Sequence, residues 1–303
     1  MIIPARLQPG DCIGFFSPAG AARDRNKVDA GISLLRDMGF RTKQAPGFDA
    51  ENEYLAAGDS DRADSFHRLL VDETVNALMA IRGGYGCLRI ADQIDFKLIA
   101  EKKKFIIGFS DICVLLNAVN HLCGMISIHG PVLTSLAASD STTVESLFSL
   151  LTNGLPGQIV PDNIAVLRPG VATGILRGGN FATIIHLLGT PWEIPFAKTL
   201  LLLEDTGEPM YKIDRMLTQL HQGGKLQKLA GIIIGQFDMG DDPKANRVLQ
   251  ERVWMRVLEL TEGLSLPVWG DFPSGHKEKN IALPLGTTLT MEKTKTLTVN
   301  STS

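Results

Sequence analysis

The stretch FIIGFSDICVLLNAV, Phe105 to Val119, contains the transition on which the interpretation of the whole chain depends. It opens with the apolar run FIIG, places Ser110 shortly after Gly108, and continues with the apolar spacing of a helix. A short apolar run that ends at a glycine is typical of a buried strand, and the spacing that follows it predicts an amphipathic helix. The stretch therefore predicts a tight strand-to-helix turn that carries a serine.

The same pattern recurs on both sides of this stretch. Apolar runs that end in a glycine-containing turn occur in DCIGFFSPAG, NALMAIRGGYG and GMISIHGP, and helical patterns such as NKVDAGISLLRDMGF lie between them. This alternation predicts an α/β fold, with an N-terminal, mostly parallel sheet flanked by helices. Such sheets bind ligands beyond the carboxyl ends of their strands, which is where SPAG, RGGYG, GFSD and HGP fall.

The composition and periodicity of the sequence change between residues 153 and 170. The segment NGLPGQIVPDNIAVLRPG is rich in proline and glycine and lacks helical periodicity. We therefore expect an N-terminal α/β domain over 1–152, a linker over 153–170, and a C-terminal domain over 171–303. The last region alternates apolar strands with helices, ends in a pattern typical of a hairpin, and is interpreted as a strand-rich α+β domain. We interpret LPLG, after Asn280, as a turn.

The composition excludes several classes of protein. With 44% apolar and 21% charged residues among 303, the chain can bury a substantial core, and disorder is not expected. A net charge of -3 gives no reason to expect nucleic acid or an acidic membrane surface as a partner. We find no secretory signal, no apolar run of the ~20 residues that span a membrane, and four cysteines without CxxC spacing. These features predict a cytoplasmic protein with buried, reduced thiols.

A serine at a strand-to-helix turn has two interpretations. As a nucleophile, its hydroxyl is exposed and the helix N-terminus offers N–H donors to a developing oxyanion. As a cap, Ser110 or Asp111 simply satisfies the first turn of the helix, and this stretch alone favours the cap. The GxSxG elbow of α/β-hydrolases is not matched, since Ile112 stands where its second glycine belongs.

A nucleophilic serine needs a base and an orienting acid. His276 lies in the polar loop DFPSGHKEKNIALPLG with no helix to cap, which makes it the candidate base, and a solvated loop histidine is the alternative. His129 ends a strand and is interpreted as structural. Helix packing or the helix dipole accounts for the remaining histidines, which are His67, His121, His186 and His221. In TLLLLEDTGEP, Glu204 directly follows a buried run, and it is better placed than Asp205 or Glu208 to fix the imidazole.

Several long segments, in order and nearly end to end, resemble the LD-carboxypeptidase family of serine peptidases. This family includes muramoyltetrapeptide carboxypeptidase and the microcin C immunity peptidases. The segments are GFFSPAG, AIRGGYGCLRIADQIDF, FIIGFSDICVLLNAV, GILRGGNFATIIHLLGTPWEIP, LLLLEDTGEPMYKIDRMLTQL and GHKEKNIALPLG. The resemblance implies a Ser-His-Glu triad with Ser110 as nucleophile, His276 as base and Glu204 as orienting carboxylate. It also implies that the latter two lie in the C-terminal domain, so that the site forms across a domain cleft.

The resemblance further implies an oxyanion hole of backbone amides. Asp111 and a glycine of RGGYG, taken as Gly84, match that role, although turn geometry accounts for Gly83 and Gly86 equally well. Arg82, beside these glycines, is a candidate to bind the terminal carboxylate of the substrate.

The implied reaction is the release of D-alanine from murein tetrapeptides, at the meso-diaminopimelate–D-alanine bond, in cytoplasmic peptidoglycan recycling. The partner is then a small peptide or muropeptide, and the family suggests a homodimer. We expect no metal and no other cofactor, since HExxH and zinc spacings are absent and RGGYG matches neither GxGxxG nor GxxxxGK[ST].

Two alternatives stay open. A microcin C immunity-type peptidase would cleave aminoacyl-nucleotide analogues with the same triad, and Trp192 in the shared GTPWEIP does not discriminate between the two. A non-catalytic peptide- or sugar-binding protein is the other alternative.

Overall fold

The computed structural model describes residues 1–45 and 54–300. The chain forms two compact units, and each is built from two pieces of chain. The first consists of Met1–Gly154 with Glu278–Gly286, and the second of Leu155–Lys277 with Thr287–Ser303. The chain therefore returns to the first unit after His276, whereas the expected C-terminal domain runs without interruption to residue 303.

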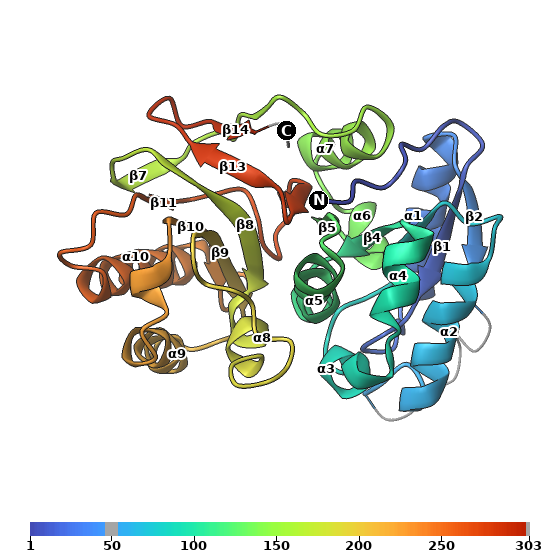
Figure 1. The fold of residues 1–303 in the computed structure, drawn as a ribbon, viewed down its shortest axis with the longest axis horizontal. Coiled ribbons are helices and arrows are strands. Elements are labelled where there is room, and N and C mark those ends of the chain that lie inside the picture. Colours follow the sequence, from blue (N-terminus) through green and yellow to red (C-terminus); the bar gives the residue numbers. More distant parts are fainter. Residues whose placement is uncertain (46–53, 301–303) are drawn as a thin grey trace. The chain divides into compact units, whose positions relative to one another are not determined.

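The first unit contains a six-stranded sheet in the order β12-β5-β4-β3-β1-β2. Figure 1 labels its strands β1, β2, β4 and β5. Five strands are parallel, and β12 adds to the edge as an antiparallel strand beside β5. The strands are β1 (Cys12–Phe16), β2 (Arg41–Gln44), β3 (Ala77–Ala80), β4 (Phe105–Gly108), β5 (Ser127–His129) and β12 (Leu283–Leu285). The segment LPLG, interpreted above as a turn, thus begins with a strand.

Every residue of β1, β3 and β4 is buried. This burial indicates that helices cover both faces of the sheet, as is usual for parallel sheets. Helix α4 contacts both α2 and α5 in one group, and α1 contacts α6 in a second. The helices are α1 (Arg25–Asp37), α2 (Asp59–Val71), α3 (Cys87–Ile90), α4 (Phe96–Lys102), α5 (Cys113–Cys123), α6 (Leu133–Leu136) and α7 (Ser141–Thr152).

The strand order reverses between β1 and β3. From β1 the chain moves to the edge at β2, then returns across β1 to β3, β4 and β5. A reversal of this kind leaves a crevice beyond the carboxyl ends of the two strands, which is the usual ligand site of an open parallel sheet. The loops that border it here are 17–21, after β1, and 81–86, after β3.

The second unit contains an eight-stranded mixed sheet in the order β6-β14-β13-β8-β9-β10-β11-β7. Its four central strands, β8 to β11, are parallel, and the outer ones are antiparallel. The strands are β6 (Gln158–Ile159), β7 (Ala165–Arg168), β8 (Ala172–Asn180), β9 (Thr199–Thr206), β10 (Gly231–Asp238), β11 (Val268–Gly270), β13 (Thr288–Met291) and β14 (Leu297–Val299). The stretch 153–170, expected as a linker, thus contributes β6 and β7.

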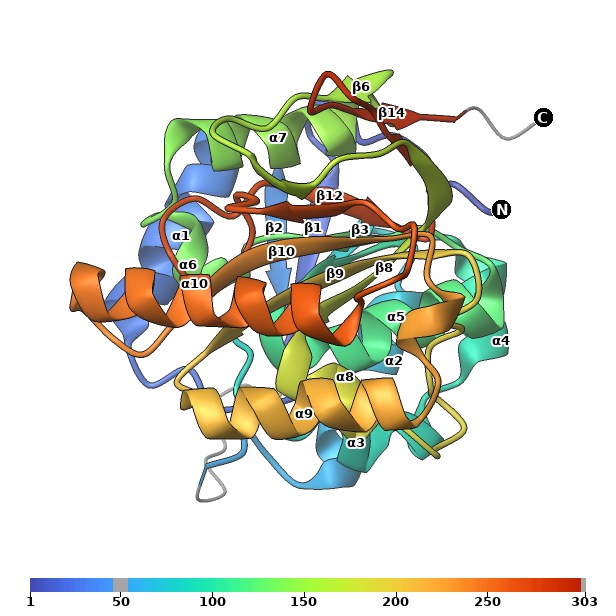
Figure 2. The ribbon, with the colours of Figure 1, turned by 90° about the vertical axis from the view of Figure 1, so that its left-hand side faces the viewer.

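Three helices pack on the parallel part of this second sheet: α8 (Phe181–His186), α9 (Met210–Gln222) and α10 (Pro243–Leu260). Helix α8 contacts β8 and β9, and α10 contacts β10 and runs beside α9 (Figure 2). Almost all residues of β9 and β10 are buried. The α/β fold with a mostly parallel first sheet and a strand-rich second part is confirmed.

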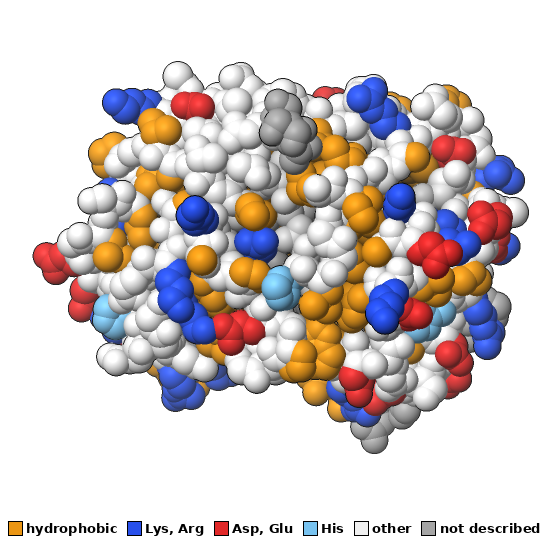
Figure 3. Space-filling view, viewed as in Figure 1, with side chains coloured by type: hydrophobic (Ala, Val, Ile, Leu, Met, Phe, Trp, Pro, Cys, Tyr) orange, Lys and Arg blue, Asp and Glu red, His pale blue; other side chains and the backbone are white. Residues whose placement is uncertain are grey.

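Among the described residues, no helix combines the length and apolar character that crossing a bilayer requires. On the face shown in Figure 3, basic and acidic side chains lie interspersed with neutral and apolar ones. Such mixing agrees with a net charge of only -3.

Candidate active site

Ser110 lies at the tip of a tight turn between β4 and α5. Its φ is +62°, in the left-handed region that non-glycine residues seldom adopt, and it starts a 3₁₀ turn, Ser110–Ile112, that runs into α5. Gly108 permits this turn, because a Cβ there would lie 2.8 Å from a side-chain carbon of Ile112. A left-handed serine costs about 1–3 kcal/mol, and such strain is typical of functional sites.

The capping interpretation of this turn is wrong. The N-cap positions are Phe109 for the 3₁₀ turn and Ile112 for α5, so neither Ser110 nor Asp111 occupies one. The buried Asp111 carboxylate instead accepts a hydrogen bond of 2.8 Å from the backbone N–H of Cys87. The turn is thus joined to the first residue of α3, just after RGGYG.

A glycine of RGGYG packs directly on the serine. A Cβ at Gly83 would lie 2.8 Å from the Cβ and 3.0 Å from the Oγ of Ser110, so only glycine fits there with the serine in place. Gly84 follows with φ +110° and lies against Gly20 of the neighbouring loop. The sequence pointed to Gly84, whereas the contact of Gly83 depends on the approach of β3 and β4 and leaves no local pattern.

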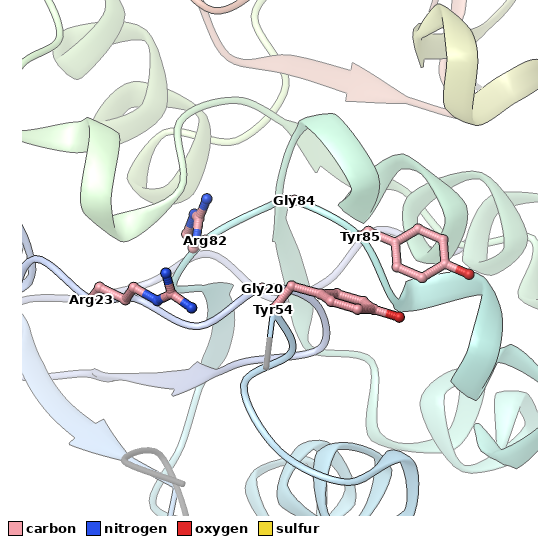
Figure 4. Close-up of a pocket in the computed structure, with 6 residues that line it drawn as sticks. All are labelled: Gly20, Arg23, Tyr54, Arg82, Gly84 and Tyr85. Atoms are coloured by element: carbon pink, nitrogen blue, oxygen red, sulfur yellow. The ribbon is translucent and has the colours of Figure 1, made fainter. Parts of the chain in front are cut away.

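A pocket of about 470 Å³ opens at the strand-order reversal of the first sheet (Figure 4). Arg23 and Arg82 lie on one side of it and the rings of Tyr54 and Tyr85 on the other. The two rings are tilted against each other with centroids 5.9 Å apart, and both are about half exposed. The lining is completed by Gly20 and Gly84, so the pocket borders the loop that packs on the serine.

Arg82 is held by its own loop system. Its Nη1 donates a hydrogen bond of 2.6 Å to the carbonyl of Ala21, while the side chain as a whole is exposed. Gly20 donates to the carbonyl of Gly83 at 3.0 Å, which joins the same two loops through their backbones. An arginine fixed in this way can present its remaining N–H groups to an anion, because a guanidinium carries five donors.

In the second unit, the structure brings His276 and Glu204 together. The Nδ1 of His276 lies 2.9 Å from Oε2 of Glu204, whose side chain is fully buried at the end of β9. A carboxylate only accepts hydrogen bonds, so Nδ1 carries the proton and Nε2 keeps its lone pair. This is the orientation that a histidine requires to act as a general base.

Two glycines allow the histidine loop to lie on β10. A Cβ at Gly235 would lie 2.4 Å from the carbonyl oxygen of Ser274, and a Cβ at Gly275, where φ is +147°, would meet Gln236 at 2.9 Å. The N–H of Gln236 donates to that same Ser274 carbonyl at 2.8 Å, and its side-chain oxygen accepts from the N–H of Lys277 at 3.2 Å. The loop is therefore fixed on both sides of His276.

Acidic side chains around His276 determine its protonation. Burial lowers the pKa of His276, but the charge and hydrogen bond of Glu204, together with the charges of Asp238 and Asp205, outweigh burial and raise the pKa above 6.5. Asp205 accepts hydrogen bonds from Asn180 and two backbone N–H groups. Its own pKa is nevertheless raised to about 6 by burial and by neighbouring Glu204.

The predicted site residues thus form two groups. Ser110, Asp111, Gly84 and Arg82 belong to neighbouring loops of the first unit, and His276 and Glu204 form a pair in the second. His129, interpreted as structural, is buried on β5 against the ring of Phe109. Among residues 1–45 and 54–300, no group of three or more His, Cys, Asp or Glu side chains is arranged to hold a metal ion.

Known proteins resemble both parts of the chain. The N-terminal domain of LD-carboxypeptidase matches residues 13–130, and the C-terminal domain matches residues 173–291. The chain belongs to the LD-carboxypeptidase family. It is 33% identical to a probable murein peptide carboxypeptidase of Bacillus subtilis, over 93% of this chain and 89% of that protein. It is 32% identical to the murein tetrapeptide carboxypeptidase of Pseudomonas aeruginosa, over 92% of each.

Solved structures resemble this chain in fold as well. The muramoyltetrapeptide carboxypeptidase of Oxalobacter formigenes superposes with a TM-score of 0.79 at 26% identity, over 96% of this chain and 99% of that one. MccF in complex with glutamyl sulfamoyl guanosine superposes with a TM-score of 0.90 at 22% identity, over 100% and 99%. The second likeness concerns the fold alone. The family resemblance inferred from the sequence segments is confirmed.

Proposed function

We propose that this chain is a serine-type LD-carboxypeptidase that releases the terminal D-alanine from murein tetrapeptides in cytoplasmic peptidoglycan recycling. The observation that carries the proposal is the 2.9 Å contact between His276 Nδ1 and the buried Glu204 carboxylate, which fixes the tautomer in which Nε2 can act as a base. The left-handed backbone of Ser110 also supports it, because strain of this kind is typical of functional sites. The relatives named murein peptide carboxypeptidase support the substrate class.

In the proposed mechanism, Ser110 Oγ attacks the carbonyl carbon of diaminopimelate while His276 Nε2 takes the hydroxyl proton. The tetrahedral oxyanion accepts hydrogen bonds from the backbone amides of Gly84 and Asp111. His276 then gives its proton to the departing amine of D-alanine, and water activated by the same imidazole releases the acyl-enzyme. Glu204 holds the tautomer and stabilises the imidazolium throughout. This requires Ser110 Oγ and His276 Nε2 to approach within about 3 Å.

The direct test is mass spectrometry of the purified protein with L-Ala-γ-D-Glu-meso-diaminopimelate-D-Ala. We expect D-alanine and the tripeptide as products, in equal amounts and without other cleavage. The same peptide with L-alanine at its C-terminus serves as the control for stereochemistry, and we expect it to resist hydrolysis. Cleavage at any other bond, or equal cleavage of the control, would contradict the proposal.

The pH profile follows from the charges around His276. The raised pKa means that the neutral, active imidazole is lost as pH falls through a value above 6.5. We expect kcat/KM to rise with pH through that value, and Asp238→Asn to move this limb to lower pH, because it removes a charge that holds the pKa up. The measurement is kcat/KM from pH 5 to pH 9 for both proteins. A limb below 6.5 in the parent protein would exclude this environment for the base.

Arg82 is proposed to bind the terminal carboxylate of the substrate. A hydrogen bond to a charged group contributes about 1.5–3 kcal/mol, so Arg82→Ala should lower kcat/KM for the tetrapeptide by about 10–100-fold. The matched comparison is the same peptide ending in a carboxamide. We expect the parent protein to discriminate against the amide and Arg82→Ala to cleave both at similar, low rates. If the variant retains the parental preference for the free acid, another residue binds the carboxylate.

The alternative within the family is hydrolysis of aminoacyl-nucleotide analogues. The exposed Tyr54–Tyr85 pair favours it, because two aromatic rings beside a pocket can stack on a nucleobase. An aminoacyl sulfamoyl adenosine, incubated under the same conditions, distinguishes the two. Hydrolysis of the nucleotide analogue with no release of D-alanine would replace the proposed function. A homodimeric state and a cytoplasmic location stay predictions.

A further inference from the structure

The peptide group between Gly86 and Cys87 is bound at both ends by buried charged side chains. Its carbonyl oxygen, on Gly86, accepts a hydrogen bond of 3.0 Å from Nη1 of Arg62. Its N–H, on Cys87, donates at 2.8 Å to the Asp111 carboxylate. Arg62 is 1% exposed and Asp111 8% exposed. One peptide plane at the end of RGGYG is therefore fixed between a guanidinium and a carboxylate.

Arg62 joins this peptide to two further segments. The same Nη1 donates to the carbonyl of Pro18, in the loop after β1, and Nε donates at 3.3 Å to the carbonyl of Ala57, before α2. Its Nη2 binds the carboxylate of Asp59, on the first turn of α2. A fully buried arginine is costly unless its donors are satisfied, and here each nitrogen of the guanidinium has a partner.

The segments joined by Arg62 are those that surround the serine. Loop 17–21 donates to the Gly83 carbonyl through Gly20, and Gly83 packs on Ser110. Gly86 lies so close to Arg62 that a Cβ there would be 2.8 Å from Nη1. Loop 82–86 is thus held at one end by Gly20 and at the other by Arg62 and Asp111.

We infer that Arg62 and the Asp111 side chain are positioning residues that preorganise loop 82–86, and with it the amide of Gly84, for oxyanion binding. The catalytic part of this inference rests on the proposed function. An oxyanion hole stabilises a transition state only if its donors are already oriented, and two charged groups on one peptide plane supply that restraint. Asp111 would then act twice, through its own backbone N–H and through its side chain.

We expect loosening of this loop to weaken binding of the transition state and to leave binding of the substrate unchanged. Removing one oxyanion-hole donor costs about 10²–10³ in kcat, so misplacing one should cost about 10–100-fold. Arg62→Lys keeps the buried charge but loses the planar set of guanidinium donors. We expect it to lower kcat by that factor, with a KM within about threefold of the parental value. Affinity for the tripeptide aldehyde, whose adduct with Ser110 carries the oxyanion, should fall in parallel, while affinity for the product tripeptide should not.

Asp111 variants and a matched arginine control separate positioning from general destabilisation. Asp111→Asn keeps an acceptor for the Cys87 N–H and should retain most activity. Asp111→Ala removes that acceptor and should lower kcat by the same factor as Arg62→Lys. Arg89 binds the other oxygen of the same Asp59 from an exposed position, so Arg89→Lys should leave kcat unchanged. Arg62→Lys and Asp111→Ala loosen the same peptide group. The fold-loss in kcat of the double variant should therefore be smaller than the product of the two single fold-losses.

Hydrogen exchange tests the restraint independently of activity. In the parent protein we expect the Cys87 amide to exchange slowly, and both Arg62→Lys and Asp111→Ala to accelerate exchange in residues 83–88 but not in β10. Unchanged exchange there, or an Arg62→Lys enzyme with parental kcat and aldehyde affinity, would overturn the inference. If the parent protein neither hydrolyses the tetrapeptide nor binds the aldehyde, the proposed function fails, and the exchange result still decides whether the loop is restrained.

Discussion

Ser110→Ala is expected to abolish release of D-alanine from the tetrapeptide. Removing the nucleophile of a Ser-His-acid triad costs about 10⁶ in kcat, and the residual rate reflects substrate binding and the oxyanion hole. The variant should still bind the tetrapeptide, because no proposed binding group is removed. The measurement is D-alanine release at high enzyme concentration together with calorimetric binding of the intact peptide.

The matched control for Ser110→Ala is Ser139→Ala, since Ser139 donates a local hydrogen bond to the carbonyl of Ser135. We expect this control to retain parental activity. If Ser110→Ala hydrolyses the tetrapeptide at the parental rate, Ser110 is not the nucleophile. If neither the parent nor the variant hydrolyses it and both bind it equally, the non-catalytic binding protein becomes the better interpretation.

The left-handed φ of +62° at Ser110 adds a prediction about stability. Alanine is strained at this φ whereas glycine is not, so Ser110→Gly should be more stable than Ser110→Ala by about 1–2 kcal/mol. Both variants should be equally inactive. Urea unfolding of the two proteins measures the difference, and an alanine variant at least as stable as the glycine variant would contradict the turn geometry.

The alternation of apolar runs and helical patterns was sufficient to predict the central strands of both sheets. It missed strands whose pairing is not visible in local sequence. Strand β2, RTKQ, is polar because it lies at a sheet edge, where side chains can face water. Strand β12 pairs with β5, although about half of the sequence separates the two strands. The short LPL pattern of β12 is equally compatible with a turn. Such long-range backbone pairing becomes apparent only in three dimensions.

In the candidate site, too, some residues can be identified from their local sequence and others only from contacts with distant segments. Chemical requirements made Glu204 and His276 candidates, the family resemblance selected them, and the structure pairs them. Their local sequence was informative because a carboxylate directly after a buried strand is costly without a partner, and a histidine in a polar loop has no helix to cap. Arg62 could not be found in this way. In DSDRADSF it resembles any charged residue on an exposed helix face, and only its 1% exposure and its backbone partners distinguish it. Burial of a charge by distant loops leaves no local signal.

Glu204→Gln is expected to lower kcat by about 10³–10⁴ with little change in KM, because the comparable carboxylate-to-amide change in other serine peptidases costs about 10⁴. The glutamine side chain nearly matches the size of glutamate, so the buried end of β9 should stay intact. Its amide group can donate to Nδ1, which favours the tautomer that carries its proton on Nε2. That tautomer cannot accept the proton of Ser110.

The same substitution should change the pH profile in a defined direction. The charge of Glu204 raises the pKa of His276, so its removal should move the remaining activity limb to lower pH, with the neutral imidazole persisting further into acid. Glu208→Gln is the matched control, because Glu208 follows closely in the chain and pairs with Lys212 at 3.3 Å rather than with the histidine. We expect the control to keep parental kcat and the parental limb. A Glu204→Gln enzyme with more than about a tenth of parental kcat would show that this carboxylate does not orient the base, since a tenfold loss corresponds to only about 1.4 kcal/mol of transition-state stabilisation.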